Sequence, residues 1–432
     1  MASTGSSSSA PSVEDAAPAD LIVGVPTYNH AGTIGAIVRS ARAAITGEFH
    51  DLRGRIIIAD GSSTDGTPAQ AAAALGEGRD SLTVLTIPNR GNEGIELPYH
   101  GTVSGRGRAL HVLLEAARDS DARAVAALDG NAAGTTPAWV AALARPVLDG
   151  SFDFVAPRYR RHPFDGALIR SIVQPVFRAC YGLQLEQPMA TDFGCSRRLL
   201  EHVLNPGIWP GDGDHTLIDL WLAATAASGG FQVCEAAVGT RRRGAREEAQ
   251  DLSGTIARIV GALFTELERR AAVWHRVRGS TAVPLFGSLP DDTLEAPAVN
   301  PSLLLQSFRL GYRELADVWA EILPPATILE LRRLAAAPEE TFRIDDHLWA
   351  RMIYDFALGH RLRVIPRDHL LRSLTPLYLG WLASFILGAR NEPENEVDAR
   401  LERTCQAFES EKPYLISRWR WPERFRPMRL NG

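Results

Sequence analysis

Acidic residues follow two of the short apolar runs in the first third of the chain. Asp60 follows Arg55–Ala59 and opens a loop of small residues, and Asp129 follows Ala124–Leu128. If these runs are parallel strands, both acids lie at the carboxyl edge of the sheet, where ligands bind. A carboxylate there accepts hydrogen bonds from a base or a ribose hydroxyl. A second acid two residues after Asp129 would favour a divalent cation, but the chain has Asn131.

A basic, glycine-rich segment precedes the second of these runs. Gly105–Leu110 opens a predicted helix and contains Arg106. Backbone amides at a helix start, together with a guanidinium, form a phosphate-binding site. A flexible loop explains this segment nearly as well. The loop Asp60–Thr67 is equally compatible with a turn that leads into a helix near Thr67.

The elements that must position these residues alternate between strand and helix. Continuous apolar runs of this kind are typical of strands buried on both faces of a mostly parallel sheet. Helix-length segments between them predict a doubly wound α/β domain over 19–250, after a disordered tail over 1–18. From residue 251 to 432 the period becomes helical, which predicts a helical C-terminal domain. The predicted strands are Leu21–Val25, Arg55–Ala59, Leu82–Ile87, Ala124–Leu128, Phe152–Ala156 and Phe231–Ala237.

Composition excludes several classes of protein. The net charge is -5, so no global basic field attracts nucleic acid or an anionic membrane. The four cysteines are far apart, and the N-terminus has no basic-then-apolar pattern, so we expect reduced thiols, a cytoplasmic location and no membrane partner. Aromatic residues of the helical half suggest either a homodimer surface or simply core, namely Trp349, Tyr354, Phe356, Tyr378 and Trp381.

Several motifs, in this order, resemble the family-2-like glycosyltransferases of GT-A fold. They are VPTYN, IADGSSTDGT, the segment Gly105–Leu110, LDGN, APRYRRHPFDG, TDFGCSRRLL and IDLWLAATA. The chain is most similar to the glucosylglycerate and glucosyl-3-phosphoglycerate synthases, and the similarity extends into the helical half. It implies transfer of a sugar from a nucleoside diphosphate, with UDP or GDP as the expected carrier, to a small polar acceptor.

The resemblance also assigns roles to individual positions. It implies that Arg106 approaches the phosphates, where the family has lysine, and that Asp129 and Asn131 lie under the ribose or diphosphate. Asp192 and Asp219 would face the donor sugar and acceptor, with retention of anomeric configuration. On the residues alone, Asp192 is alternatively a helix cap and Asp219 a solvated helix residue. The residues expected to line the nucleoside pocket are Pro26, Tyr28, Asp60 and Ser62.

The chain departs from the family pattern at the metal site. Besides Asn131, it has Arg243 where the relatives place a metal-binding histidine. Our hypothesis is that Arg243, with Arg241 or Arg106, stabilises the leaving diphosphate, so that no metal is obligatory. The alternative is that His215 supplies a relocated metal ligand, with magnesium or manganese as the cofactor.

The acceptor pocket departs as well. The segment 165–170 lacks the hydroxyls with which relatives seat glycerate, while Arg158, Arg160 and His162 remain able to bind an anionic acceptor. These departures favour another acceptor in a specialised natural-product pathway. One example is S-glycosylation of a thiol such as ergothioneine in lincosamide biosynthesis. The alternatives are an ordinary glucosylglycerate-type synthase and a catalytically dead scaffold that binds a sugar nucleotide.

Overall fold

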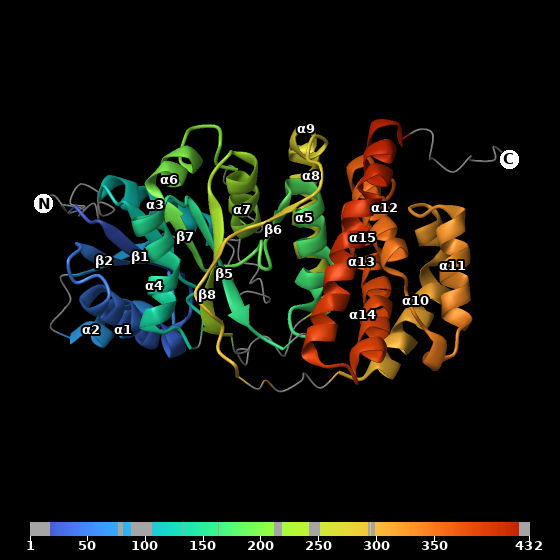
Figure 1. Ribbon diagram of the computed structural model, residues 1–432, viewed down its shortest axis with the longest axis horizontal. Helices are drawn as coiled ribbons and strands as arrows, with labels where there is room; N and C mark the ends of the chain where they lie inside the picture. Colours follow the sequence, from blue (N-terminus) through green and yellow to red (C-terminus); the bar gives the residue numbers. More distant parts are fainter. Residues whose placement is uncertain are drawn as a thin grey trace, which may run out of the picture.

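The computed structural model describes residues 18–76, 81–87, 106–132, 134–162, 164–210, 218–241, 251–292, 294 and 299–422. All but the last residue of the predicted tail at 1–18 lies outside this range. A mixed α/β half, on the left of Figure 1, is followed by a helical half on the right. This is the GT-A-like arrangement expected from the sequence.

The α/β half is built on an eight-stranded sheet of order β10-β8-β5-β7-β4-β1-β2-β3. Neighbouring strands are parallel except that β7 is antiparallel to both β4 and β5. The short strands β6 (Leu183–Gln184) and β9 (Thr281–Ala282) form a separate pair. The strands of the large sheet are β1 Leu21–Thr27, β2 Gly54–Asp60, β3 Leu82–Thr86, β4 Ala124–Ala127, β5 Phe154–Arg160, β7 Phe193–Ser196, β8 Val233–Thr240 and β10 Leu285–Phe286.

Strand register brings the predicted acids to one edge of the sheet. Thr27 at the end of β1 pairs with Asp60 at the end of β2. Ala127, the last residue of β4, pairs with Phe193, the first residue of β7. Asp129, two residues after Ala127, and Asp192, directly before Phe193, therefore also lie at this edge. The antiparallel direction of β7 is what places its first residues beside the last residues of β4.

Helices cover both faces of the sheet, and side chains alternate between two cores along each strand. Val23 of β1 packs on the face covered by α1 (Ala31–Gly47) and α4 (Pro137–Arg145), whereas Ile22 faces α3 (Arg106–Asp119). At Gly24 a Cβ would lie 2.5 Å from Leu113 Cδ1, so only glycine lets α3 pack this closely on β1. The remaining helical segments of this half are α2 Thr67–Leu75, η4 Pro146–Gly150, η5 Ile169–Val173, α5 Gln174–Tyr181, α6 Arg197–Val203 and α7 Ile218–Ser228.

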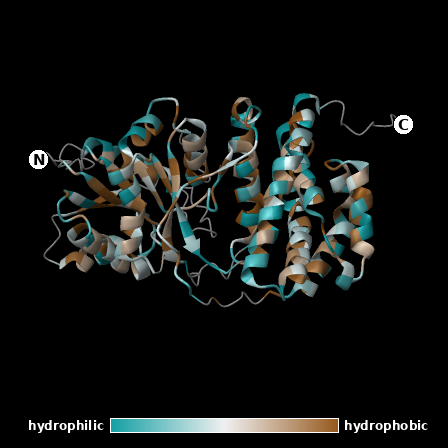
Figure 2. Ribbon diagram, viewed as in Figure 1, coloured by the Kyte–Doolittle hydropathy of each residue, from teal (hydrophilic) through white to brown (hydrophobic). Residues whose placement is uncertain are grey.

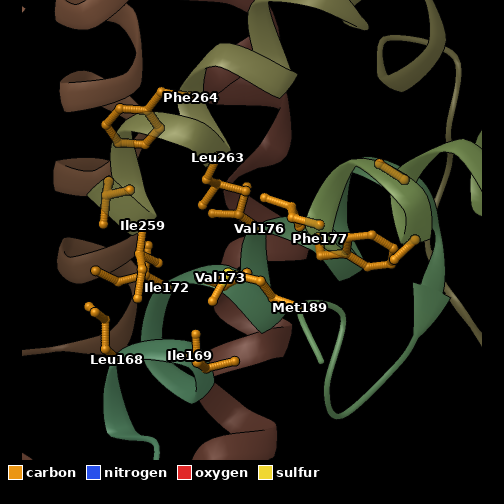
Figure 3. Close-up of a cluster of buried hydrophobic side chains, with 14 of the residues drawn as sticks. Leu168, Ile169, Ile172, Val173, Val176, Phe177, Met189, Ile259, Leu263 and Phe264 are labelled. Carbon is orange, nitrogen blue, oxygen red and sulfur yellow. The ribbon is translucent and has the colours of Figure 1, made fainter. Parts of the chain in front are cut away.

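The helical half shares its hydrophobic core with the sheet. Figure 3 shows Ile172 and Val176, from η5 and α5, beside Ile259 and Leu263 of α8. Side chains on both sides of the predicted boundary at 250/251 therefore lie in one continuous core. The helical segments of this half are α8 Leu252–Arg269, α9 Ala271–Trp274, α10 Pro301–Ala320, α11 Pro325–Ala336, η7 Glu339–Thr341, α12 Asp346–Leu362, α13 Arg367–Ser373, α14 Thr375–Ala389 and α15 Glu394–Arg420.

The aromatic residues that suggested a dimer surface lie in this core. Trp349 and Phe356 have no exposed surface, and the other three are at most 4% exposed. They are core residues, and a homodimer stays a prediction without their support. Figure 2 shows hydrophobic residues along the strands and on the inward sides of the helices. Among the described residues one helical stretch, Arg367–Ala389, is long and apolar enough to cross a membrane, but 67% of its apolar window is buried inside the protein, as in a core helix.

Candidate active site

The first two loops at the carboxyl edge of the sheet are tied together around Asp60. This carboxylate is 1% exposed and accepts hydrogen bonds from Thr27 Oγ1 at 3.0 Å, from the Ser63 amide at 2.8 Å and from Ser63 Oγ at 2.6 Å. Asn29 and Ser62 both have positive φ, 53° and 64°. Such strained backbone is tolerated where surrounding contacts enforce it, and it is concentrated at functional sites.

Other contacts show that the loop Asp60–Thr67 leads into a helix and also lies beside the other residues predicted for the nucleoside pocket. Thr67 is the first residue of α2, so the loop is also a helix-entry turn. Ser62 donates a hydrogen bond to the Ile87 carbonyl at 2.7 Å, so its hydroxyl serves the loop. Pro26 pairs in register with Ala59, and the Tyr28 ring lies against Gly61, where a Cβ would be 3.7 Å from Tyr28 Cδ2. The four residues assigned to the nucleoside pocket therefore lie together.

Three carboxylates and two guanidinium groups form the centre of the site. We call Asp129, Asp192, Asp219, Arg106 and Arg241 the carboxylate–arginine cluster. Its members come from the ends of β4 and β8, the residue before β7, and the first turns of α3 and α7. All three carboxylates are at most 4% exposed, so each charge depends on the two arginines for compensation.

Arg106 and Asp219 form a bidentate buried pair that joins α3 to α7. Arg106 Nη2 lies 2.9 Å from Asp219 Oδ1, and Nε lies 3.1 Å from Oδ2. Arg106 Nη2 also donates to the Thr191 carbonyl at 2.8 Å. Asp219 is therefore not the solvated helix residue that the sequence left open, and Arg106 is fixed by protein groups at its inner end.

Arg241 lies between the other two carboxylates. Its Nη2 is 3.1 Å from Asp129 Oδ2, and its Nη1 is 3.6 Å from Asp192 Oδ2. The Asp129 amide donates to Asp192 Oδ1 at 2.7 Å, so the two acids are linked directly. The other alternative for Asp192, a helix cap, is wrong, because Ser196 caps α6 by accepting a hydrogen bond from the Leu199 amide.

The environment separates the pKa values of the three acids. Burial raises the pKa of Asp129, but Arg241 and Arg106 outweigh burial and hold that pKa at about 2. The pKa of Asp192 is raised by burial and by the charge of Asp129. Burial also raises the pKa of Asp219, against the opposing effect of Arg106. Asp129 is therefore the carboxylate most firmly held as an anion, and its charge raises the pKa of both Asp192 and Asp219.

Tyr159, which the sequence reasoning missed, completes the cluster. Its hydroxyl donates to Asp192 Oδ2 at 2.5 Å, and burial together with Asp192 raises the pKa of the phenol well above its usual value. The guanidinium groups of Arg161 and Arg241 lie 5.0 and 5.1 Å from its ring centroid, within the range of cation–π attraction. The available signal was strand alternation, which places Tyr159 on the opposite face of β5 from Arg158 and Arg160.

The predicted acceptor residues lie apart from the cluster. Arg158 pairs with Glu186 at 2.8 Å and with Glu235 at 3.6 Å, and Arg160 pairs with Glu394 of α15. His162 Nδ1 accepts the Phe164 amide at 3.1 Å, and burial lowers the pKa of His162.

Arg160 and His162 also line a cavity of about 360 Å³ between β5 and the start of α15. The structure therefore joins Arg158 and Arg160 to carboxylates of the protein rather than to the cluster. Arg243 and His215 lie outside the described residues.

Protein donors engage the carboxylates of the site at which a divalent cation would bind. Asp129 Oδ1 accepts the Asn131 amide at 3.0 Å, and Oδ2 accepts Thr191 Oγ1 at 2.9 Å beside Arg241. Both oxygens of Asp192 are likewise engaged by protein donors. Within the described ranges, no three His, Cys, Asp or Glu side chains are arranged to hold a metal ion. Arg241 also contacts both carboxylates.

Comparison with known proteins identifies the class of this fold and site. Residues 22–188 match the family model described as glycosyl transferase family 2. Residues 22–188 thus form a glycosyl transferase family 2 domain, and the match identifies glycosyl transfer as the class of reaction. No curated protein matches the sequence.

Three solved structures illustrate the similarity. A mycobacterial protein is 22% identical, with 60% of this chain and 77% of that chain covered and a TM-score of 0.42. Glucosyl-3-phosphoglycerate synthase from Mycobacterium tuberculosis, in complex with Mn²⁺, UDP and glucosyl-3-phosphoglycerate, is 21% identical over 60% and 84% of the two chains, TM-score 0.40. Mannosyl-3-phosphoglycerate synthase from Rubrobacter xylanophilus is 20% identical over 66% and 80%, TM-score 0.40.

Proposed function

We propose that this chain transfers a sugar from a nucleoside diphosphate to a small anionic acceptor of the glycerate type, and that Arg241 replaces a divalent cation at the diphosphate. The observation that carries the proposal is the carboxylate–arginine cluster at the carboxyl edge of a family 2 domain. The sequence alone favoured another acceptor in a specialised pathway, with S-glycosylation of a thiol as the example, but no side chain among the described residues specifically supports a thiol acceptor. We therefore favour the glucosylglycerate-type reading of the motifs.

Arg241 is the cluster member best placed to meet the diphosphate. Its side chain is 18% exposed, against 7% for Arg106, so Arg241 is the more accessible of the two arginines, and it also binds Asp129 and lies beside Asp192. A fixed guanidinium in a partly water-excluded site stabilises charge that develops on a leaving diphosphate. It needs no deprotonation and no bound ion, because arginine stays charged at every accessible pH.

Arg161 is the residue of the Arg158–Arg161 run that supports an anionic acceptor. Its guanidinium lies over the same Tyr159 ring as Arg241, on the cluster side of β5. A carboxylate-bearing acceptor held there would lie close to the donor sugar. Asp192, which Tyr159 and the Asp129 amide hold in position, is then the carboxylate expected to bind hydroxyls of the transferred sugar. With no carboxylate assigned as a covalent nucleophile, we expect front-face attack and retention of configuration.

The test is a transfer assay with metal-free enzyme. EDTA-treated protein is incubated with UDP-glucose or GDP-glucose and with D-glycerate, 3-phosphoglycerate or ergothioneine, and products are identified by mass spectrometry. Glycosylated glycerate or phosphoglycerate formed without metal supports the proposal. Turnover that requires Mn²⁺ overturns the role of Arg241, and a product with ergothioneine alone overturns the acceptor class.

The catalytically dead scaffold is distinguished in the same experiment. Nucleotide binding without hydrolysis or transfer, for any donor and acceptor tested, would favour that alternative.

A matched pair of variants separates the cluster from general effects of arginine loss. Arg241→Gln should abolish turnover, whereas Arg145→Gln, which removes a surface partner of Glu48, should leave turnover unchanged.

A further inference from the structure

A cavity flanked by charged residues lies along α8, away from the residues assigned above. It has a volume of about 600 Å³, which is within the range of small-molecule sites. One wall is formed by Ile218 and Trp221 of α7, and the other by α13. We call it the α8 groove. Its α8 residues recur every three or four positions, as on one helix face: Gly254, Ala257, Arg258, Gly261, Ala262, Thr265, Glu266 and Arg269.

Small residues make the floor of the α8 groove. At Gly261 a Cβ would lie 2.9 Å from Leu371 Cδ1, so glycine is needed where α8 and α13 approach. Ile218 and Trp221 are 2% and 6% exposed and give the opposite wall an apolar surface. The groove therefore combines a hydrophobic wall with a charged rim, as ligand pockets usually do.

Most cations of the rim are paired. Arg269 lies 3.2 Å from Glu266, Arg367 lies 2.8 Å from Glu268, and Arg372 lies 2.9 Å from Asp368. Each of these ion pairs leaves little net charge for a ligand. In these three pairs a carboxylate of the protein neutralises the arginine.

Arg258 is the exception on this rim. It is partly buried, and its one hydrogen bond is a weak contact of 3.4 Å with Thr255 Oγ1. Within the part of the chain that the structure describes, no carboxylate lies within ion-pair distance of its guanidinium. Burial lowers the pKa of Arg258, and the nearby positive charge of Arg372 acts in the same direction, partly opposed by Asp251. A partly buried guanidinium without a counter-ion is destabilising, so an anion placed against it is favoured.

We propose that the α8 groove binds a small phosphorylated molecule, with its phosphate held by Arg258 and its less polar part against Ile218 and Trp221. A phosphate suits Arg258 because a guanidinium group binds phosphate oxygens bidentately. Asp251 lies at one end of the groove and is 3.9 Å from Arg372. Its negative charge directs the phosphate away from the start of α8 and toward the middle of the helix.

The binding test uses inorganic phosphate as the probe. Titration is followed by calorimetry and thermal shift, with chloride at equal ionic strength as the control. We expect Arg258→Gln to weaken phosphate binding by about tenfold or more, the loss of one charge-assisted contact. Arg333→Gln, which removes a surface partner of Glu330, should change nothing. Equal binding by wild type and Arg258→Gln would overturn the proposal.

A second variant distinguishes this site from the carboxylate–arginine cluster. Arg241→Gln should keep phosphate binding in the α8 groove, and UDP should not displace the phosphate. If Arg241→Gln abolishes phosphate binding or UDP competes for it, the phosphate belongs to the donor site and the proposal is wrong. This outcome is separate from failure of the proposed transfer reaction, because it is read without turnover.

The same variant identifies the source of the phosphate. If Arg258→Gln raises the KM for a phosphorylated acceptor about tenfold with kcat unchanged, the groove holds the acceptor. If KM is unchanged but added glycerol phosphate no longer alters the rate, the groove holds a regulator. Either result supports a phosphate site at Arg258, since both depend on the same contact.

Discussion

Removing Asp219 should destabilise the protein far more than removing one partner of a surface ion pair would. Asp219→Ala leaves Arg106 buried with only the Thr191 carbonyl and the more distant acids as partners. Breaking a buried pair by removing one charge costs about 3–5 kcal/mol, because the remaining charge is uncompensated. The free energy of unfolding should fall by that amount.

The control is a surface pair of the same geometry. Arg53 Nε lies 2.9 Å from Asp20 Oδ2, the same distance as the shortest contact in the buried pair, but the Arg53 side chain is 62% exposed. Asp20→Ala should cost less than about 1 kcal/mol. The double variant Arg106→Met/Asp219→Leu should recover most of the loss caused by Asp219→Ala, since an apolar pair leaves no buried charge.

Urea unfolding followed by tryptophan fluorescence and circular dichroism measures these differences. A loss with Asp219→Ala no larger than with Asp20→Ala would refute the reasoning. The same holds if the double variant loses as much stability as Arg106→Met and Asp219→Leu lose in sum when each is made alone, because contacting residues should show non-additive effects. Either result would mean that the cluster is not held together by charge compensation.

Three further predictions concern the cluster and a second buried acid. Arg241→Gln should weaken metal-free nucleotide binding by about tenfold or more in calorimetry, with Arg145→Gln as the unchanged control. Tyr159→Phe removes the hydrogen bond to Asp192. It should lower kcat about tenfold and shift the pH profile of kcat, while nucleotide affinity stays the same. A loss of nucleotide affinity instead would indicate a merely structural role for Tyr159. Burial raises the pKa of Asp355 from 3.8 to about 7, so the folded chain binds the extra proton and the free energy of unfolding should fall as pH rises from about 4 to about 7. Asp355→Asn should flatten that slope, and an unchanged slope would contradict the assignment.

Much of the fold was predictable because its signals are local. Buried parallel strands read as continuous apolar runs, and all six predicted strands are present with shifted ends. Strand β7 was missed, since four residues that include a glycine and a cysteine carry no periodic signal. Its antiparallel direction also could not be read from the chain, although it is what delivers Asp192 to the carboxyl edge.

The site was predictable only in part, because its pairings are not local. Asp60 and Asp129 could be placed at strand ends from sequence. The partnership of Arg106 with Asp219 spans 113 positions, so no spacing rule finds it. Arg158 and Arg160 looked like a basic acceptor site, but strand alternation turns them toward carboxylates of the protein and turns Tyr159 toward the cluster.

The most direct test of the central claim is nucleotide binding by metal-free protein. EDTA-treated enzyme is titrated with UDP, GDP and ADP by calorimetry, and the titrations are repeated with Mn²⁺. We expect micromolar binding of one nucleotide without metal and little change when Mn²⁺ is added. Binding that appears only with Mn²⁺ would contradict the role of Arg241 and would point to a metal ligand such as His215.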